Sequence, residues 1–407
     1  MAAVVEARGA DGTPVQWVDR KRKLWLLAFI VPTFPLVAVW LATATGLDVF
    51  WFWGILFAFG LVPLADVLIG DDPSNPPEEI AKALQADPWY RWIVLAYLPA
   101  QYAVWAWTVW YVATHDLTWL QQGGLAVTLG IVTGVGINAA HELGHKREEL
   151  EHWASKVALA PTLYGHFFVE HNWGHHKRVA TPEDPASSRL GESFYRFWPR
   201  TVFGSLRSAW GLERTRLQRK GKRVLSPSNR VLHAWSFSVV LWGAALVLGG
   251  IELLPFLLVQ AVIGLSLLEA VNYVEHYGLL REKDASGRYE RVRPRHSWNN
   301  NHIVTNLLLY QLQRHSDHHE NPARRFVALR HMGEAPQLPA GYAAMILLAL
   351  FPPVWRRVMD PRVLAHYGGD ISRANRSRRG RVHLGSATGA VPDAAPGAAG
   401  GAATPGS

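Results

Sequence analysis

The stretch Glu170-His171-Asn172-Trp173-Gly174-His175-His176 places three histidines within six residues. On a helix, His171 and His175 would lie one turn apart on the same face, with His176 beside them. Imidazoles at this spacing are typical of metal sites built on helices. One such cluster is also compatible with a patch of solvated histidines, so the rest of the chain has to decide between these interpretations.

Three further clusters carry histidines in the same manner. They are His141-Glu142-Leu143-Gly144-His145-Lys146, Asn272-Tyr273-Val274-Glu275-His276-Tyr277-Gly278 and Leu312-Gln313-Arg314-His315-Ser316-Asp317-His318-His319. The four clusters together supply nine candidate metal ligands: His141, His145, His171, His175, His176, His276, His315, His318 and His319. Nine imidazoles are too many for one ion, so we expect two. Imidazole binds Zn, Cu, Fe and Ni, and ligand type alone does not name the metal.

The composition indicates a membrane protein. Of the 407 residues, 49% are hydrophobic and only 18% are charged, which is a low charge content for a soluble globular protein. Six apolar stretches have the length of about 20 residues that crosses a bilayer. They cover residues 24–45, 49–69, 92–113, 117–140, 232–249 and 253–273. We therefore predict an all-α integral membrane protein with six transmembrane helices and a cytoplasmic helical domain that carries the histidine-rich metal site.

Basic residues predict the orientation. Arg20-Lys21-Arg22-Lys23 precedes the first apolar stretch, and the segment 141–231 is rich in Arg and Lys, whereas the short links on the other side have none. Because Lys and Arg accumulate on the cytoplasmic side, both termini and all four histidine clusters are expected there. The net charge of +9 follows from the same bias, and we do not expect nucleic-acid binding.

The chain divides into three parts. Residues 1–23 form an N-terminal cytoplasmic segment, expected to be polar and mobile over 1–17. Residues 24–375 form the six-helix membrane domain with its cytoplasmic cap. Residues 376–407 form an Ala/Gly/Pro-rich tail, expected to be disordered or to act as a linker.

Each histidine cluster also carries a carboxylate beside a histidine: Glu142, Glu170, Glu275 or Asp317. A metal-bound histidine usually donates its second ring N–H to a carboxylate or a carbonyl. These four residues are therefore candidate partners of the ligands, and ion pairing with basic residues is the alternative. With the clusters on one side of the membrane, adjacent His175 and His176 are expected to face different ions.

Glu269 lies inside the last predicted span, seven residues before His276, and Asn272 lies four residues before it. These spacings place the three side chains on one helix face. A carboxylate inside a span normally faces the protein interior or a functional site. We therefore expect Glu269 and Asn272 to face the metals and to take part in catalysis.

The chain contains no cysteine, so it has no thiolate ligand and no iron–sulfur centre of its own. Any electrons for redox chemistry have to come from another protein.

The four clusters, in this order, resemble those of the membrane-bound alkane 1-monooxygenase (alkane omega-hydroxylase) family, whose members are integral-membrane, histidine-rich di-iron oxygenases. The 141–146 and 312–319 clusters are similar to the first and last boxes of that family. The 170–176 cluster runs on into Val-Ala-Thr-Pro-Glu-Asp-Pro-Ala-Ser-Ser-Arg at 179–189, like the second box. Asn-Tyr-Val-Glu-His-Tyr-Gly-Leu at 272–279 resembles the element that separates these hydroxylases from related acyl desaturases.

The resemblance covers about residues 20–370 and implies two non-haem iron ions (Fe2+/Fe3+) held by the histidines. It implies O2 activation and terminal hydroxylation of medium- to long-chain n-alkanes to 1-alkanols. It also implies rubredoxin as the electron donor, itself reduced by rubredoxin reductase with NADH, and a multi-pass location in the bacterial inner (plasma) membrane. Alkane would enter from the lipid bilayer between the spans.

Trp51, Trp53 and Phe57 of the second span are candidate residues of the substrate channel. Lipid-facing or packing roles are the alternative for these aromatic side chains. Two other functions also remain open. One is a related di-iron enzyme, such as a xylene-type hydroxylase or an acyl desaturase. The other is a transition-metal transporter, which would need ligands near the bilayer midplane rather than beyond the helix ends.

Overall fold

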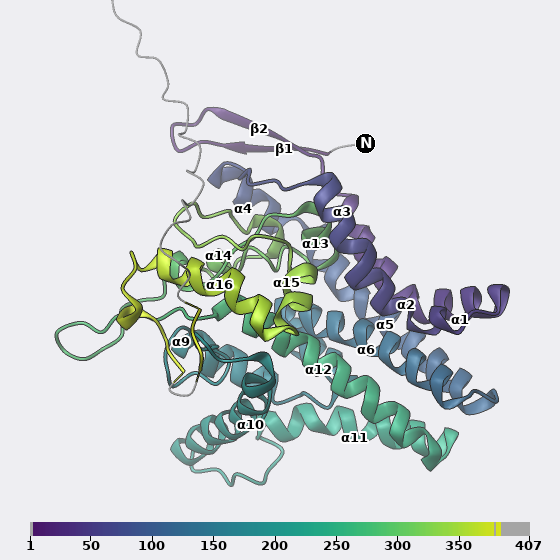
Figure 1. Cartoon of the computed structure of the whole chain (residues 1–407). Coiled ribbons are helices and arrows are strands. Elements are labelled where there is room, and N and C mark those ends of the chain that lie inside the picture. Colours follow the sequence, from purple (N-terminus) through teal and green to yellow (C-terminus); the bar gives the residue numbers. More distant parts are fainter. Residues whose placement is uncertain (1–2, 378–379, 384–407) are drawn as a thin grey trace, which may run out of the picture.

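The computed structural model describes residues 3–377 and 380–383, and its regular structure is almost entirely helical (Figure 1). In this part of the chain, five helical segments are long and apolar enough to cross a membrane. They are Leu24–Thr45, Asp48–Ile69, Trp119–Gly144, Arg230–Gly249 and Ile251–His276. The prediction of a helical, multi-pass membrane protein is therefore confirmed.

The remaining expected span, 92–113, lies within α5 (Pro88–Thr114), a helix of 27 residues. This helix is long enough to cross a bilayer, but its mean hydropathy is lower than that of the other five segments. Its many Trp and Tyr side chains and the buried Gln101 lower its hydropathy. The sixth crossing, like the cytoplasmic side of the clusters, stays a prediction.

The first two spans are not single α-helices. The first joins η1 (Leu24–Thr33) to α1 (Phe34–Thr45). The second runs through η2 (Asp48–Phe52), α2 (Trp53–Ile55), η3 (Leu56–Leu61) and α3 (Val62–Ile69). Proline has no backbone N–H and clashes with the preceding turn. Pro32 accordingly lies inside the 3-10 helix η1. Pro63 lies in the first turn of α3, directly after the π-helix η3.

The helix α6 (Trp119–Gly144) is the central helix of the molecule, since 89% of its membrane-crossing stretch is buried. It packs along α12 (Leu254–His276). Gly130 permits this contact, because a Cβ atom there would lie 2.6 Å from the Cβ of Ile263 on α12. The close packing brings the ends of both helices, and therefore His141 and His276, to the same region of the protein.

The N-terminal segment differs from the prediction. The strands β1 (Ala3–Arg8) and β2 (Pro14–Asp19) form an antiparallel hairpin, so residues 3–19 have regular structure where the sequence predicted a polar segment without it. The sequence Asp11-Gly12 between two runs of alternating apolar residues is a hairpin signal, and Gly12 has the positive φ of 82° that such a turn requires. The hairpin packs on α4 (Glu78–Ala86).

The cap surrounds the ends of α6 and α12. It consists of α7 (Glu149–Ala158), α8 (Phe167–Val169), η5 (Glu170–His175), α9 (His176–Arg178), α10 (Phe194–Arg219), α13 (Ile303–Leu308), α14 (His315–Glu320), α15 (Tyr342–Ala349) and α16 (Pro352–His366). In Figure 1 the hydrophobic helices, including α11 (Arg230–Gly249), extend to the right, while α9, α10, α14 and α16 gather at the left. Most of the predicted tail, 376–407, lies outside the described residues.

Candidate metal centre

The structure brings all nine predicted histidines together in two adjacent groups. The first group contains His141, His145, His171, His176 and His318, and the second contains His175, His276, His315 and His319. Within each group, the candidate ligand nitrogens all lie within 4.8 Å of one another. Seven of these histidines are buried, and His145 and His176 are half-buried.

The ring nitrogens of the second group converge as ligands do. The Nε2 atom of His319 lies 2.8 Å from that of His315 and 3.3 Å from that of His175. The Nε2 atoms of His315 and His276 are 3.3 Å apart. Two imidazole nitrogens that bind one ion at about 2.0–2.1 Å are about 2.8–3.4 Å apart at right or tetrahedral angles. The second group therefore fits a metal ion.

The first group has the same geometry. The Nε2 atom of His176 lies 3.1 Å from the Nε2 atoms of both His171 and His318. The Nε2 atoms of His141 and His145 are buried and have no hydrogen-bond partner among the described residues. Buried polar atoms without a partner are rare in native proteins unless a water or an ion satisfies them. The first group therefore fits a second metal ion.

The backbone conformation of the central stretch differs from the α-helix that the sequence suggested. Residues Glu170–His175 form a π-helix, in which the N–H of His176 donates to the carbonyl of His171, five residues earlier. A π turn holds more residues than an α turn, so the side chain that joins His171 is His176 rather than His175. His175 and His176 consequently belong to different groups.

Regular helices present the other paired ligands. His141 and His145, at the end of α6, are four residues apart and share the first group, as the α-helical period predicts. On α14, His315 and His319 are likewise four apart and share the second group, while His318 turns to the first.

Burial favours the uncharged form of several of these histidines. It lowers the pKa of His171, His176 and His318 well below the usual value of 6.5, and the neighbouring histidines add to this effect. These imidazoles are therefore neutral at physiological pH. Only the neutral ring offers a lone pair to a metal, so the site is prepared for binding.

Asp184, which the sequence did not single out, contacts the candidate ligand His175. Its Oδ2 atom lies 2.9 Å from Nδ1 of His175 and also accepts a hydrogen bond from the Ser187 hydroxyl. Burial raises the pKa of Asp184, but His175 and Ser187 outweigh it and bring the pKa to about 2. Asp184 is nine residues from His175 and beside no histidine, so no local pattern marked it.

Of the four carboxylates proposed as partners of the ligands, three form ion pairs with basic side chains instead. This is the alternative that the sequence left open, and the expectation is corrected for these three. The distances are 2.9 Å for Lys146–Glu142, 2.6 Å for Arg178–Glu170 and 2.9 Å for Arg324–Asp317.

Glu275 is the proposed carboxylate that contacts an imidazole, at 3.1 Å between its Oε2 and Nε2 of His315.

Glu269 and Asn272 lie in one hydrogen-bonded network. The Glu269 carboxylate accepts hydrogen bonds from the Tyr164 hydroxyl at 2.6 Å, the Thr201 hydroxyl at 2.8 Å and the Asn272 amide at 3.2 Å. Asn272 lines the cavity described next, whereas Glu269 is not part of its wall. The structure therefore places Glu269 behind Asn272, where it fixes the orientation of the amide.

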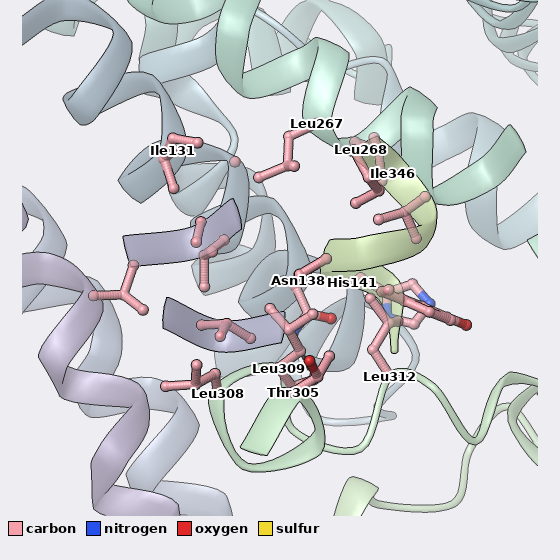
Figure 2. Close-up of a pocket in the computed structure, with 18 of the residues that line it drawn as sticks. Ile131, Asn138, His141, Leu267, Leu268, Thr305, Leu308, Leu309, Leu312 and Ile346 are labelled. Carbon is pink, nitrogen blue, oxygen red and sulfur yellow. Dashed lines mark hydrogen bonds between the residues drawn. The ribbon is translucent and has the colours of Figure 1, made fainter. Parts of the chain in front are cut away.

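An apolar cavity leads from the membrane helices to the histidines. Its walls include Leu267, Leu308 and Leu309, which Figure 2 shows around the cavity together with His141. His171 and His315 also line it, so it reaches histidines of both groups.

Of the three proposed channel residues, Phe57 lines this cavity, but Trp51 and Trp53 do not. Trp51 is buried, and its carbonyl accepts a hydrogen bond from Thr128 on α6. The expectation is therefore wrong for Trp51, which packs against α6 instead, while Trp53 packs on Phe57 with ring centroids 6.1 Å apart.

A basic groove of about 970 Å³ is lined by η5, α9, the loop that follows α9, and α10. Its only acidic lining residues among those described are Glu183, Asp184 and Glu213, and its basic lining residues are Lys177, Arg178, Arg189, Arg200, Arg207, Arg216, Arg219, Lys220 and Arg230. Asp184 thus lines the groove and also contacts His175.

Comparison with known proteins identifies the family. A fatty acid desaturase family model matches residues 117–382. The chain is 46% identical to an alkane 1-monooxygenase of Acinetobacter baylyi over 88% of either chain. It is 45% identical to an alkane 1-monooxygenase of Ectopseudomonas oleovorans, over 90% of this chain and 91% of the relative. The chain is also 45% identical to an alkane 1-monooxygenase of Pseudomonas putida, over 89% of this chain and 90% of the relative. This chain therefore belongs to the alkane 1-monooxygenase family, among the proteins that match the fatty acid desaturase model.

Proposed function

We propose that this enzyme hydroxylates the terminal carbon of medium- to long-chain n-alkanes to give 1-alkanols. The reaction consumes one O2, two electrons and two protons per alkane, and releases water. The observation that carries the proposal is the apolar cavity that ends at His141, His171 and His315. It would deliver a hydrocarbon to both groups of ligands.

The two groups would hold two non-haem iron ions through the nine histidines. Iron is favoured because the reaction needs a redox-active metal, which excludes Zn, and because neutral imidazoles suit iron. When bound, the irons would supply the chemistry that activates O2 and attacks a C–H bond. Asp184 would hold the His175 ring in the orientation that directs its Nε2 toward the ion.

The cavity selects the substrate by shape. An alkane offers only apolar area, worth about 0.8 kcal/mol for each buried CH2, and has no polar group that could orient it. Leu267, Leu308 and Phe57 would hold the chain extended, so that its end meets the histidines first.

The electron donor is proposed to be rubredoxin, reduced by rubredoxin reductase with NADH. These 407 residues contain no cysteine for an iron–sulfur centre, so the donor's iron has to be held by cysteines outside them. The basic groove suits an acidic carrier, since complementary charge steers association. It also approaches the second group of histidines, because Asp184 belongs to the groove wall and contacts His175.

We propose that the enzyme resides in the bacterial inner membrane, with the groove and both termini on the cytoplasmic side. The abundance of Arg and Lys on the groove side supports this orientation.

The test combines iron analysis with product identification. Purified protein in detergent should hold about two irons per chain, and with rubredoxin, its reductase and NADH it should convert octane to 1-octanol. His171→Ala should abolish the product, whereas His115→Ala, at the exposed end of α5, should not. Formation of a methylbenzyl alcohol from xylene or an olefinic acyl product, without 1-octanol, would reject the proposal in favour of a related enzyme.

A further inference from the structure

Glu275 occupies a position that the other acidic residues of the centre do not share. It is the single carboxylate among the described residues that line the apolar cavity, and its relative exposure is 1%. Its Oε1 atom makes no hydrogen bond of regular geometry in the described part of the chain, and the buried Tyr342 hydroxyl interacts with the carboxylate. A buried ionised carboxylate is costly unless it is paired or coordinates a metal.

The contact of Glu275 with His315 involves the metal-facing side of the ring. Its Oε2 lies 3.1 Å from Nε2 of His315. The same Nε2 atom is 2.8 Å from Nε2 of His319 and 3.3 Å from Nε2 of His276. The carboxylate oxygen therefore approaches His315 on the atom by which His315 converges with the other ligands.

A carboxylate that merely orients a ligand uses the other ring nitrogen. Asp184 does so, because it contacts Nδ1 of His175 while Nε2 of His175 faces His319. By contrast, Nδ1 of His315 is buried and has no partner among the described residues. Glu275 thus lacks the geometry of a residue that supports a ligand from behind.

The number of imidazoles leaves room for one more ligand. The first group has five histidines and the second has four. The separation of 3.1 Å between Oε2 and Nε2 of His315 equals the nitrogen–nitrogen separations in the first group. Glu275 is not among the side chains whose ligand atoms all lie within 4.8 Å of one another, so its carboxylate would reach the ion from beside His315 by a rotation of its side chain.

We propose that Glu275 is a ligand of the metal ion in the second group. This ion would then be bound by four imidazoles and one carboxylate, and the other by five imidazoles. The inference rests on the proposed function for the identity of the metal. The two iron sites would differ in net charge as well as in ligand type, because the anionic carboxylate would bind one iron and not the other.

The experiment uses the full chain, purified in detergent and loaded with 57Fe, and Mössbauer spectroscopy of the reduced protein. The wild type should give two ferrous doublets of equal area. In Glu275→Gln and Glu275→Asp, one doublet should shift or disappear, and iron content should fall by up to half, while the other doublet stays unchanged. Wild-type doublets and iron content in both variants would overturn the inference.

Glu183→Gln is the control, because the Glu183 carboxylate accepts a hydrogen bond from Tyr289 at the surface. Both of its doublets should remain at the wild-type positions. If neither Glu275 variant folds, the wild type labelled with 13C-glutamate provides the test. Its infrared spectra with and without iron are then compared. Iron loading should shift a glutamate carboxylate band, and no shift would refute the proposal.

The outcomes also separate this inference from the proposed function. The inference alone is contradicted if the wild type binds two irons and forms 1-octanol, but the iron spectrum is the same in the wild type and in both Glu275 variants. Protein whose iron responds to Glu275 but that forms no 1-octanol contradicts the proposed function alone.

Discussion

The Nε2 atoms of His171 and His176 lie 3.1 Å apart, although the two residues are five positions apart along the chain. The hydrogen bond from the N–H of His176 to the carbonyl of His171 closes a π turn between them. A regular α-helix would have joined His171 with His175 instead. The π turn therefore assigns His175 to the second group and makes this stretch the connection between the two candidate metal positions.

Gly174 should be required for this turn. A Cβ atom there would lie 2.5 Å from Oε2 of Glu170 and 2.6 Å from Nη2 of Arg178, which form an ion pair. Gly174→Ala should therefore lower stability by about 1–3 kcal/mol, as overpacking does, and weaken iron retention. Thermal unfolding in detergent measures the first effect. Gly243→Ala, where a Cβ meets open space, is the control and should leave stability almost unchanged.

Asp184→Asn should weaken iron binding without unfolding the protein. The variant lacks the carboxylate that accepts a hydrogen bond from Nδ1 of His175. Loss of the carboxylate partner of a metal-binding histidine typically lowers metal affinity about 10–100-fold. Competition with a chelator measures the affinity. Glu183→Gln changes the adjacent residue, which contacts Tyr289 at the surface, and should retain wild-type affinity. Equal affinity of both variants would show that Asp184 does not support a ligand.

Metal-free protein should lose stability as the pH falls below about 6.5. Burial lowers the pKa of His171, His176 and His318 in the folded state, so the unfolded chain binds more protons in this range. The stabilising contribution is complete above pH 6.5 and declines below it, by up to about 1.4 kcal/mol per pH unit for each such histidine. Unfolding curves at pH 7.5 and 5.5 test this, and His176→Gln should reduce the slope.

Reversing charge in the basic groove should impair electron delivery. Lys177→Glu with Arg219→Glu should raise the KM for rubredoxin about tenfold or more and leave kcat almost unchanged, because steering charges act on association. Added salt should have a similar effect on the wild type. Arg288→Glu, in an exposed loop outside the groove, is the control. Kinetics insensitive to both changes would place the docking surface elsewhere.

Phe57 should influence which alkanes are accepted. Its ring lines the cavity, so Phe57→Ala should enlarge the space and favour longer or bulkier chains. The ratio of products from a mixture of octane and hexadecane measures this preference. Trp51→Ala removes an aromatic ring that lies outside the cavity wall, and should lower stability by about 3–5 kcal/mol, as loss of a buried Trp does, without changing the ratio.

Local features of the sequence sufficed for the helical membrane class and for the set of nine histidines. Long apolar runs are recognisable without knowing their neighbours, and imidazoles spaced at one helical turn mark one face of a helix. The ion pair of Glu142 with Lys146 was also within reach, since the two residues are four apart. The hairpin signal at Asp11-Gly12 was present but was outweighed by the polar character of the segment.

The tertiary structure decided how the nine histidines divide into two groups and which carboxylates contact them. The spacing of His171, His175 and His176 is compatible with an α turn or a π turn, and the folded chain adopts the π turn. Asp184 reaches His175 because the chain folds back after α9, and Glu275 meets His315 because α12 ends beside α14. Such contacts depend on the relative positions of distant segments, whereas spacing along one segment determines only which side chains share a face.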